Sequence, residues 1–169
     1  LTMRGSALLA GGGALWSGTN EGTVWTSLGS FPGHDIIDIF VDPASSSRIF
    51  IASNQVPVPR AWLDFTVNNA ASWTSREIKM AESTPGSVNS IDVSPDGRVF
   101  VAANDDFGGL GGGLYYSDDY GETWMLKYDN SPVNDVRADR ANPGRVYAVV
   151  NGNLRYSNTD GDSWHSVST

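Results

Sequence analysis

One structural unit recurs along this chain with a period of roughly 40 to 50 residues, and this repeat constrains the fold more than any other feature. The clearest copy lies between residues 87 and 129, and its four β-prone segments are residues 88–93, 98–103, 114–117 and 123–128. The first segment alternates apolar and polar residues, the second is almost entirely apolar, and turns rich in Gly, Pro and Asp separate them. These patterns predict four consecutive strands joined as hairpins.

Three more stretches repeat the unit less completely. Residues 133–168 copy it with shorter loops, and residues 36–78 carry the same strand pattern. Residues 6–33 are the faintest copy, in which we expect residues 14–18 and 23–27 to form the second and third strands. Four antiparallel strands make one blade of a β-propeller. The sequence therefore predicts an all-β propeller segment of about four blades, either a closed ring or an arc of a larger propeller.

A polar turn follows the third strand of the clearest copy. Residues 117–124 have the spacing Ser-x-Asp-x-Gly-x-Thr-Trp. Gly tolerates positive φ, and the Asp carboxylate can accept hydrogen bonds from N–H groups of its own turn, so the motif first specifies a folded corner. It resembles the Asp-box, or BNR repeat, which marks one hairpin per blade in sialidases, sortilin-type receptors and xyloglucanases.

Two weaker copies of this motif occupy the same place in other repeats. Residues 157–164 keep Ser, Gly, Ser and Trp but have Thr159 at the Asp position, and the carboxylate moves to Asp160. Residues 66–73 have Ala70 in place of Gly. Because Ala does not favour positive φ, we expect either another turn geometry or a decayed motif there.

The resemblance implies that the motif residues brace the blades and take no part in chemistry. In Asp-box proteins the polar side chains satisfy backbone donors of the hairpin, the Trp packs between sheets, and the boxes lie opposite the substrate face. The residues to which this structural role is assigned are Ser117, Asp119, Gly121, Thr123, Trp124, Ser157, Gly161, Ser163 and Trp164.

The sequence shows no residue pattern typical of a sialidase active site or of a xyloglucanase active site. Sialidases need arginines that converge on one ligand, but Arg48, Arg98 and Arg145 occupy the same position in three repeats, which indicates blade architecture. A glycoside hydrolase of the xyloglucanase kind needs two carboxylates that face each other across a cleft. The chain has 19 Asp and Glu residues, and nothing in their spacing distinguishes such a pair.

The loops opposite the motif turns are the predicted ligand-binding surface. Asp105, Asp106 and Phe107 place an aromatic ring beside hydrogen-bond acceptors, which suits sugar recognition, and the alternative is a flexible acidic insertion. Asp105 and Asp106 are also the candidate ligands of a calcium ion, and no other cofactor is expected. Arg60 and Trp62 follow a proline-containing loop on the same face. Trp62 either stacks on a ligand or belongs to the core.

Composition excludes several kinds of partner and site. The formal net charge of −8 repels phosphate backbones, so nucleic acid is not an expected partner. No apolar run approaches the roughly 20 residues of a membrane span, so membrane insertion is not expected either. The chain has no cysteine, which excludes disulfides and thiolate metal sites.

Two functional hypotheses remain at this point. The first is a non-enzymatic binding or scaffold module of an extracellular, cell-surface or virion-associated protein, which recognises glycan or protein through its loop faces. The second is part of a glycoside hydrolase whose active site includes residues outside this chain. In either case an open arc would expose two apolar blade faces, so we expect further blades or subunits to cover them.

Overall fold

The computed structural model describes residues 2–3, 6–11, 13–19, 22–58, 60–79, 86–104, 112–129 and 131–167. The strands in this part of the chain form four antiparallel sheets of four strands each. No α-helix occurs among the described residues, and none of them belongs to a helix that could cross a membrane. The prediction of an all-β fold built from four-stranded units is confirmed.

Each sheet is formed by four strands that are consecutive in the sequence. The first sheet contains β1 (Thr2–Met3), β2 (Ser6–Gly11), β3 (Ala14–Thr19) and β4 (Val24–Ser30). The second contains β5 (His34–Val41), β6 (Ile49–Gln55), β7 (Ala61–Thr66) and β8 (Thr74–Glu77). The third contains β9 (Ser87–Val93), β10 (Val99–Asn104), β11 (Gly113–Ser117) and β12 (Met125–Asp129). The fourth contains β13 (Val133–Ala138), β14 (Val146–Val150), β15 (Asn153–Ser157) and β16 (His165–Ser166).

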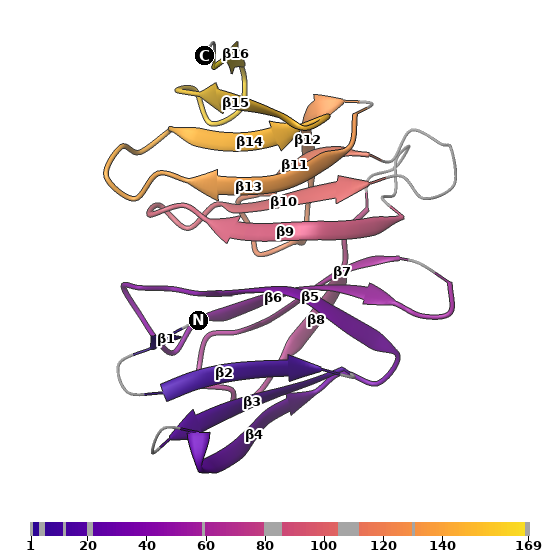
Figure 1. The fold of residues 1–169 in the computed structure, drawn as a ribbon, viewed down its shortest axis with the longest axis vertical. Helices are drawn as coiled ribbons and strands as arrows, with labels where there is room; N and C mark the ends of the chain where they lie inside the picture. Colours follow the sequence, from indigo (N-terminus) through magenta and orange to yellow (C-terminus); the bar gives the residue numbers. More distant parts are fainter. Residues whose placement is uncertain are drawn as a thin grey trace.

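The four sheets follow one another along the long axis of the molecule in the order of the sequence (Figure 1). The first sheet lies at the bottom of that view and the fourth at the top. Apolar clusters join the first sheet to the second, the second to the third and the third to the fourth. The first and fourth sheets lie at opposite ends of this axis, so the described residues form an open arc (Figure 1).

The second strands of the middle sheets explain why parts of the sequence are continuously apolar. β6 and β10 lie inside their sheets, and Phe50, Ile51, Phe100 and Val101 on them are at most 1% exposed. Neighbouring residues on a strand point to opposite faces of the sheet, so both faces must be covered. A strand covered on both faces has no polar side and loses the alternation of a half-exposed strand.

The first repeat differs from the expected assignment. Residues 14–18 and 23–27 were expected to be the second and third strands, but they belong to β3 and β4, the third and fourth strands of the first sheet. The indole N–H of Trp73 in the second repeat donates to the backbone oxygen of Leu28 on β4 at 2.7 Å. The expectation was wrong because adjacent hairpins of one blade have the same local pattern, and only the pairing of β3 with β2 decides which hairpin is present.

Equivalent leucines on the third strands of three sheets differ in exposure. Leu63 and Leu114 are fully buried, whereas Leu154 is 46% exposed. Their strand partners are Ala52, Ala102 and Val149, which places all three leucines at the same register position.

We predict that Leu63→Ala lowers the free energy of unfolding by about 2–5 kcal/mol, because it opens a cavity in the core between the second and third sheets. Leu154→Ala is the matched control, and it should cost less than about 1 kcal/mol because nearly half of that side chain is already in water. Urea unfolding followed by circular dichroism measures both values. Equal losses in the two variants would contradict this account of the core.

Candidate functional site

A groove of about 770 Å³ lies where the outer strands of the second and third sheets meet. Its lining residues are Trp62, Arg76, Glu77, Lys79, Gly121, Glu122 and Trp124. The first four belong to β7, β8 and the segment that follows β8, and the last three to the turn between β11 and β12. The groove therefore depends on the packing of two sheets, because neither sheet provides all of its lining.

More cationic than anionic side chains lie around the groove. Glu77 binds both Arg60, at 2.9 Å, and Lys79, at 3.1 Å. Desolvation by itself would raise the pKa of Glu77, but the hydrogen bonds and charges of Lys79 and Arg60 outweigh it and lower the pKa. Glu122 pairs with Arg76 at 2.7 Å. Among the lining residues and Arg60, three cations meet two carboxylates, so these five side chains carry one positive charge in excess, in a chain of net charge −8.

The structure brings Arg60 and Trp62, two of the predicted ligand-binding residues, to the same place. Trp62 pairs with Glu77 across β7 and β8, and Glu77 in turn binds Arg60. The Trp62 ring is half-buried and lies 5.1 Å from the ring of His34. Trp62 therefore lines the groove and also packs against its own sheet. The other three predicted ligand-binding residues, Asp105, Asp106 and Phe107, lie outside the described residues.

Arg76 joins the second sheet to the third at the floor of this region. Its Nη1 donates to the backbone oxygens of Asp119 at 3.0 Å and Tyr120 at 2.7 Å, and its Nη2 contacts Glu122. The guanidinium also lies over the ring of Phe65, 5.3 Å from its centre. Arg76 thus fixes the turn of one blade to the outer strand of the preceding blade.

A Ser, a His and an Asp meet on the second sheet, but they do not form a catalytic relay. The buried carboxylate of Asp64 accepts hydrogen bonds from Ser53 Oγ at 2.6 Å and Ser75 Oγ at 2.5 Å. His34 Nδ1 lies 3.2 Å from Ser53 Oγ and 3.3 Å from Asp64 Oδ2. A relay needs the two ring nitrogens to face different partners, whereas here one nitrogen faces both. Ser53 is also fully buried, so these residues form a structural polar network.

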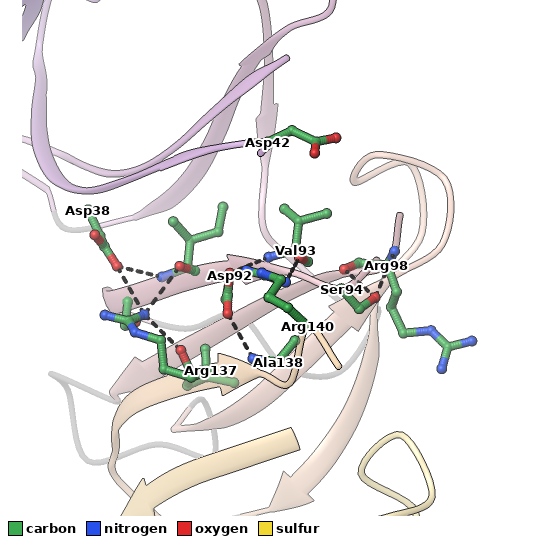
Figure 2. Close-up of polar contacts among 12 residues, drawn as sticks. Asp38, Asp42, Asp92, Val93, Ser94, Arg98, Arg137, Ala138 and Arg140 are labelled. Carbon is green, nitrogen blue, oxygen red and sulfur yellow. Dashed lines mark hydrogen bonds and ion pairs between the residues drawn. The ribbon is translucent and has the colours of Figure 1, made fainter. Parts of the chain in front are cut away.

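Carboxylates on the first strands hold consecutive sheets together (Figure 2). Asp38 on β5 accepts a hydrogen bond at 3.0 Å from the backbone N–H of Ile91 on β9. Asp92 on β9 accepts one at 2.7 Å from the N–H of Ala138 on β13. The first strand of a sheet pairs on one side only, so its other N–H groups need partners from elsewhere. These carboxylates supply some of them.

Asp92 has one property of a general acid but lacks access to a substrate. Burial raises its pKa, although hydrogen bonds from Ala138 N and Val93 N and the charge of Arg140 oppose that rise. Its side chain is only 5% exposed. The guanidinium of Arg140 forms an ion pair with one carboxylate oxygen of Asp92 (Figure 2). The same guanidinium lies over the ring of Phe40. Asp92 is therefore enclosed by groups of the protein itself.

Asp38, Asp92 and Glu77 do not have the properties of the carboxylate pair that a glycoside hydrolase requires. Such enzymes place an acid and a base or nucleophile on opposite sides of an open cleft, and the acid needs a raised pKa. Asp38 and Asp92 are occupied by backbone N–H groups, and the pKa of Glu77 in the groove is lowered. Among the described residues there is also no group of three His, Asp or Glu side chains that could hold a metal ion.

The turn 117–124 satisfies its own backbone through two side chains. Asp119 Oδ1 accepts hydrogen bonds from Thr123 N at 2.9 Å and Ser117 Oγ at 2.8 Å, and Asp119 Oδ2 accepts one from Thr123 Oγ1 at 2.6 Å. Ser117 Oγ accepts one from Gly121 N at 2.7 Å. Gly121 has a φ of +85°, and a Cβ there would lie 2.9 Å from Leu63 of the second sheet. Trp124 is 6% exposed and belongs to the core between these sheets.

The turn 157–164 makes a similar set of bonds without the carboxylate. Thr159 Oγ1 accepts from Ser163 N at 3.0 Å, and Ser157 Oγ accepts from Gly161 N at 2.9 Å. Trp164 packs against the core between the third and fourth sheets. The displaced carboxylate of Asp160 pairs with Arg98 of the third repeat at 3.1 Å.

The turn 66–73 corrects the expectation that Ala70 would require another geometry. Ala70 N donates to Thr66 Oγ1 at 3.2 Å, and Ser72 N donates to Asn68 Oδ1 at 3.1 Å, which are the same bonds as in the turn 117–124. Ala70 has a φ of +62°, so it adopts the left-handed conformation that Gly121 adopts. The expectation was wrong because the side-chain bonds hold Ala in a conformation that Ala does not favour by itself.

Sequence reasoning missed the cations on the outer strands. Arg76 comes three residues after Trp73, and Lys127 comes three residues after Trp124. Lys127 contacts Asp162 in the next turn, as Arg76 contacts Glu122. A cation three residues after the motif Trp was therefore a repeated signal in the sequence, and it marks contacts between one blade and the next.

Comparisons with known proteins find similar solved structures but no similar sequences. No family model matches the chain, and no curated protein matches it in sequence. The GH74 xyloglucanase from Xanthomonas campestris has a TM-score of 0.74 at 19% identity, over 98% of this chain and 29% of that one. YCF48 bound to D1 peptide has a TM-score of 0.65 at 17% identity, over 98% and 50%. A protein of the Nidogen/Laminin complex has a TM-score of 0.64 at 12% identity, over 96% and 61%.

These likenesses show a β-propeller fold. The chain spans between 29% and 61% of the length of these three proteins. They include an enzyme, a protein bound to a peptide and a protein of a protein complex, so the fold by itself does not decide between catalysis and binding.

We predict that Ala70→Gly raises the free energy of unfolding by about 0.5–1 kcal/mol. Release of the left-handed strain of an L-residue gains about 1–2 kcal/mol, and the greater chain entropy of Gly in the unfolded state offsets part of that gain. The reciprocal variant Gly121→Ala should lose at least about 1 kcal/mol, because the new Cβ also meets Leu63. Urea unfolding of both variants checks the opposite signs, and a stabilised Gly121→Ala would contradict them.

We also predict a pH-dependent contribution from Asp119. Desolvation by itself would raise the pKa of Asp119, but the hydrogen bonds from Thr123, Ser117 and the Glu122 backbone together outweigh it and lower the pKa from 3.8 to about 2. A carboxyl whose pKa is lowered by folding stabilises the protein above its unfolded pKa of about 3.9, and that contribution disappears as pH falls toward the folded value. Wild type should therefore be more stable than Asp119→Asn at about pH 5, and the difference should shrink toward about pH 2. If urea unfolding gave the same difference in free energy of unfolding at both pH values, the prediction would be wrong.

Proposed function

We propose that this chain is a non-enzymatic, protein-binding segment of a β-propeller protein, and that the groove beside Trp62 is its contact surface. The observation that carries the proposal is the meeting of an aromatic ring with Arg60, Arg76 and Lys79 in a chain that is otherwise strongly acidic. Aromatic and arginine side chains are enriched at protein interfaces, because they combine apolar area with hydrogen-bond donors.

The proposed ligand is an acidic segment of a protein partner that also carries an apolar side chain, which matches the cations and the aromatic ring of this surface. Arg60 is 53% exposed and Lys79 is 62% exposed, so both keep donors accessible to a ligand while they share Glu77. An acidic ligand would relieve the excess of cations around Glu77, and its apolar side chain would contact Trp62. Opposite charges also accelerate encounter, and this effect weakens with salt.

Two further observations support binding over hydrolysis. The carboxylates at Asp38, Asp92 and Glu77 are occupied by backbone N–H groups or cations, which leaves them unsuited to general acid–base chemistry. Among the structural neighbours, YCF48 is bound to a peptide and the nidogen and laminin proteins form a complex. An extracellular, cell-surface or virion-associated setting remains part of the proposal, supported by the resemblance of residues 117–124 to an Asp-box.

The motif turns have a structural role in this proposal. Ser117, Asp119 and Thr123 form a hydrogen-bonded turn that resembles an Asp-box, and this turn presents Gly121 and Glu122 to the groove. Trp124 anchors that turn in the core. In this proposal the turn contributes to the binding surface by positioning its loop, and the ligand contacts are assigned to Arg60, Trp62 and Lys79.

We predict that the chain binds a fluorescein-labelled, Glu-rich peptide that contains one Phe at least about tenfold more tightly than a Lys-rich peptide of the same length. The double variant Arg60→Glu with Lys79→Glu should lose at least about tenfold in affinity, because two attractive charges become repulsive. Fluorescence anisotropy measures the dissociation constants, and the wild-type affinity should fall as salt is raised.

Arg145→Glu with Arg155→Glu is the matched control, since it makes the same change in net charge away from the groove. This control variant should bind as wild type does. Equal affinity for the two peptides, or an equal loss in both double variants, would refute the groove as the contact surface. Release of reducing sugar from xyloglucan by this chain alone would instead establish the hydrolase, and tight binding of xyloglucan oligosaccharides without turnover would establish a glycan ligand.

A further inference from the structure

Two tryptophans that line the groove have hydrogen-bond donors without a partner. The indole Nε1 atoms of Trp62 and Trp124 are buried, and no acceptor within the described residues bonds to either. A buried N–H group without an acceptor costs free energy, so nearly all such groups in native proteins are paired. Each exception requires an explanation, and two exceptions in the lining of one groove indicate a common one.

Trp124 differs in this respect from the equivalent Trp of the preceding repeat. The indole N–H of Trp73 donates to the backbone oxygen of Leu28 on the first sheet at 2.7 Å. Trp124 has the same motif position and is 6% exposed, yet no described residue accepts from its indole N–H. A Cβ on Gly121 would lie 3.6 Å from Cε2 of Trp124, the ring carbon that is bonded to Nε1. The edge of the ring that carries the donor therefore lies near Gly121, which lines the groove.

The architecture of a blade does not explain the ring of Trp62. The strand registers place Gly113 of the third sheet and Asn153 of the fourth at the position of Trp62. Neither of these residues carries a ring, so a sheet is complete without an aromatic side chain at this position. Trp62 is half-buried and lines the groove, which indicates that its ring serves the groove.

The chemistry of the surface indicates which acceptor these donors lack. Arg60 and Lys79 share Glu77 and attract an acidic segment to the groove. A hydrogen bond to a carboxylate is stronger than one to a neutral oxygen, so an acidic ligand offers the best acceptors for the two indoles. The rigid ring also holds each N–H in one direction, whereas Arg and Lys side chains are flexible. The indoles therefore select the position of the acceptor, which the cations do not.

We infer that carboxylate oxygens of the acidic ligand accept hydrogen bonds from the indole N–H groups of Trp62 and Trp124. This inference rests on the proposed function of the groove and assigns its specificity to two neutral donors. Each indole nitrogen has almost no contact with solvent, so side chains of the groove move as the ligand enters. Lys79 and Glu122 are 62% and 64% exposed, so their rearrangement disrupts no core packing.

Nuclear magnetic resonance of the complete chain, labelled with nitrogen-15, tests the inference directly. The six Trp residues each contribute one indole N–H signal. Addition of the Glu-rich peptide that contains one Phe should move the signals of Trp62 and Trp124 downfield, because a hydrogen bond to a carboxylate deshields the proton. The signal of Trp73 is the internal control, and it should stay in place because its N–H is already bonded to Leu28.

A double-mutant cycle separates the N–H group of Trp62 from the apolar area of its ring. Trp62→Phe keeps an aromatic ring without a donor, and it should weaken binding of the Glu-rich peptide at least about tenfold. It should weaken a peptide with Gln in place of every Glu by a smaller factor, because a bond to a neutral oxygen is weaker. Fluorescence anisotropy measures the dissociation constants.

Trp164→Phe is the matched control. The indole N–H of Trp164 also lacks an acceptor among the described residues, but this ring packs between the third and fourth sheets and does not line the groove. Trp164→Phe should therefore bind the Glu-rich peptide as wild type does.

The outcomes separate this inference from the proposed function. If binding depends on Arg60 and Lys79 but the signals of Trp62 and Trp124 do not move, the groove remains the contact surface and this inference is wrong. Equal losses for the Glu and Gln peptides in Trp62→Phe would also overturn it, since ring area and not the donor would then be responsible. Absence of binding by the Glu-rich peptide would overturn the proposed function and this inference with it.

Discussion

The fold depends on two kinds of contact between neighbouring sheets. Hydrogen bonds satisfy the free N–H groups of the first strands, and apolar side chains bury the faces of the sheets. The first strands pair on one side only, and carboxylates such as Asp38 and Asp92 accept N–H groups of the neighbouring first strand. Apolar clusters behind them bury the sheet faces. Because these apolar clusters join consecutive sheets within the described residues, the structure is a series of similar units. One ion pair reaches further, between Arg137 of the fourth sheet and Asp38 of the second at 3.7 Å.

The turns show which part of a motif is necessary for its geometry. Asp119 is charged and Thr159 and Asn68 are neutral, yet each offers an oxygen that accepts the backbone N–H four residues on. The left-handed position is filled by Gly121 in one turn and Ala70 in another. An acceptor at one position and a tolerated positive φ at another are therefore sufficient. The negative charge and the Gly strengthen the turn without being required for it.

The candidate site follows from this architecture. The groove exists because Arg76 on β8 holds the turn of the next blade, which places Glu122 and Gly121 opposite Trp62 and Lys79. Sequence reasoning found Arg60 and Trp62 because they follow a stiff loop, but it placed them on the face opposite the motif turns, whereas the groove brings Trp62 beside the turn 117–124. It could not find Glu77 and Glu122, since a carboxylate on a polar strand or turn carries no signal until its partners are known.

The sequence by itself determined the strands, the four repeats and the motif turns, because each rests on short-range alternation, turn chemistry and residues at most a few positions apart. Only the tertiary structure decided that residues 14–18 form a third strand, that Ala70 keeps the left-handed turn, and that Ser53, His34 and Asp64 form a structural network. It also decided that Leu154 is exposed although Leu63 and Leu114 are buried. These outcomes depend on which sheet lies against which, and that is set by contacts between segments about forty residues apart, which local pattern does not encode.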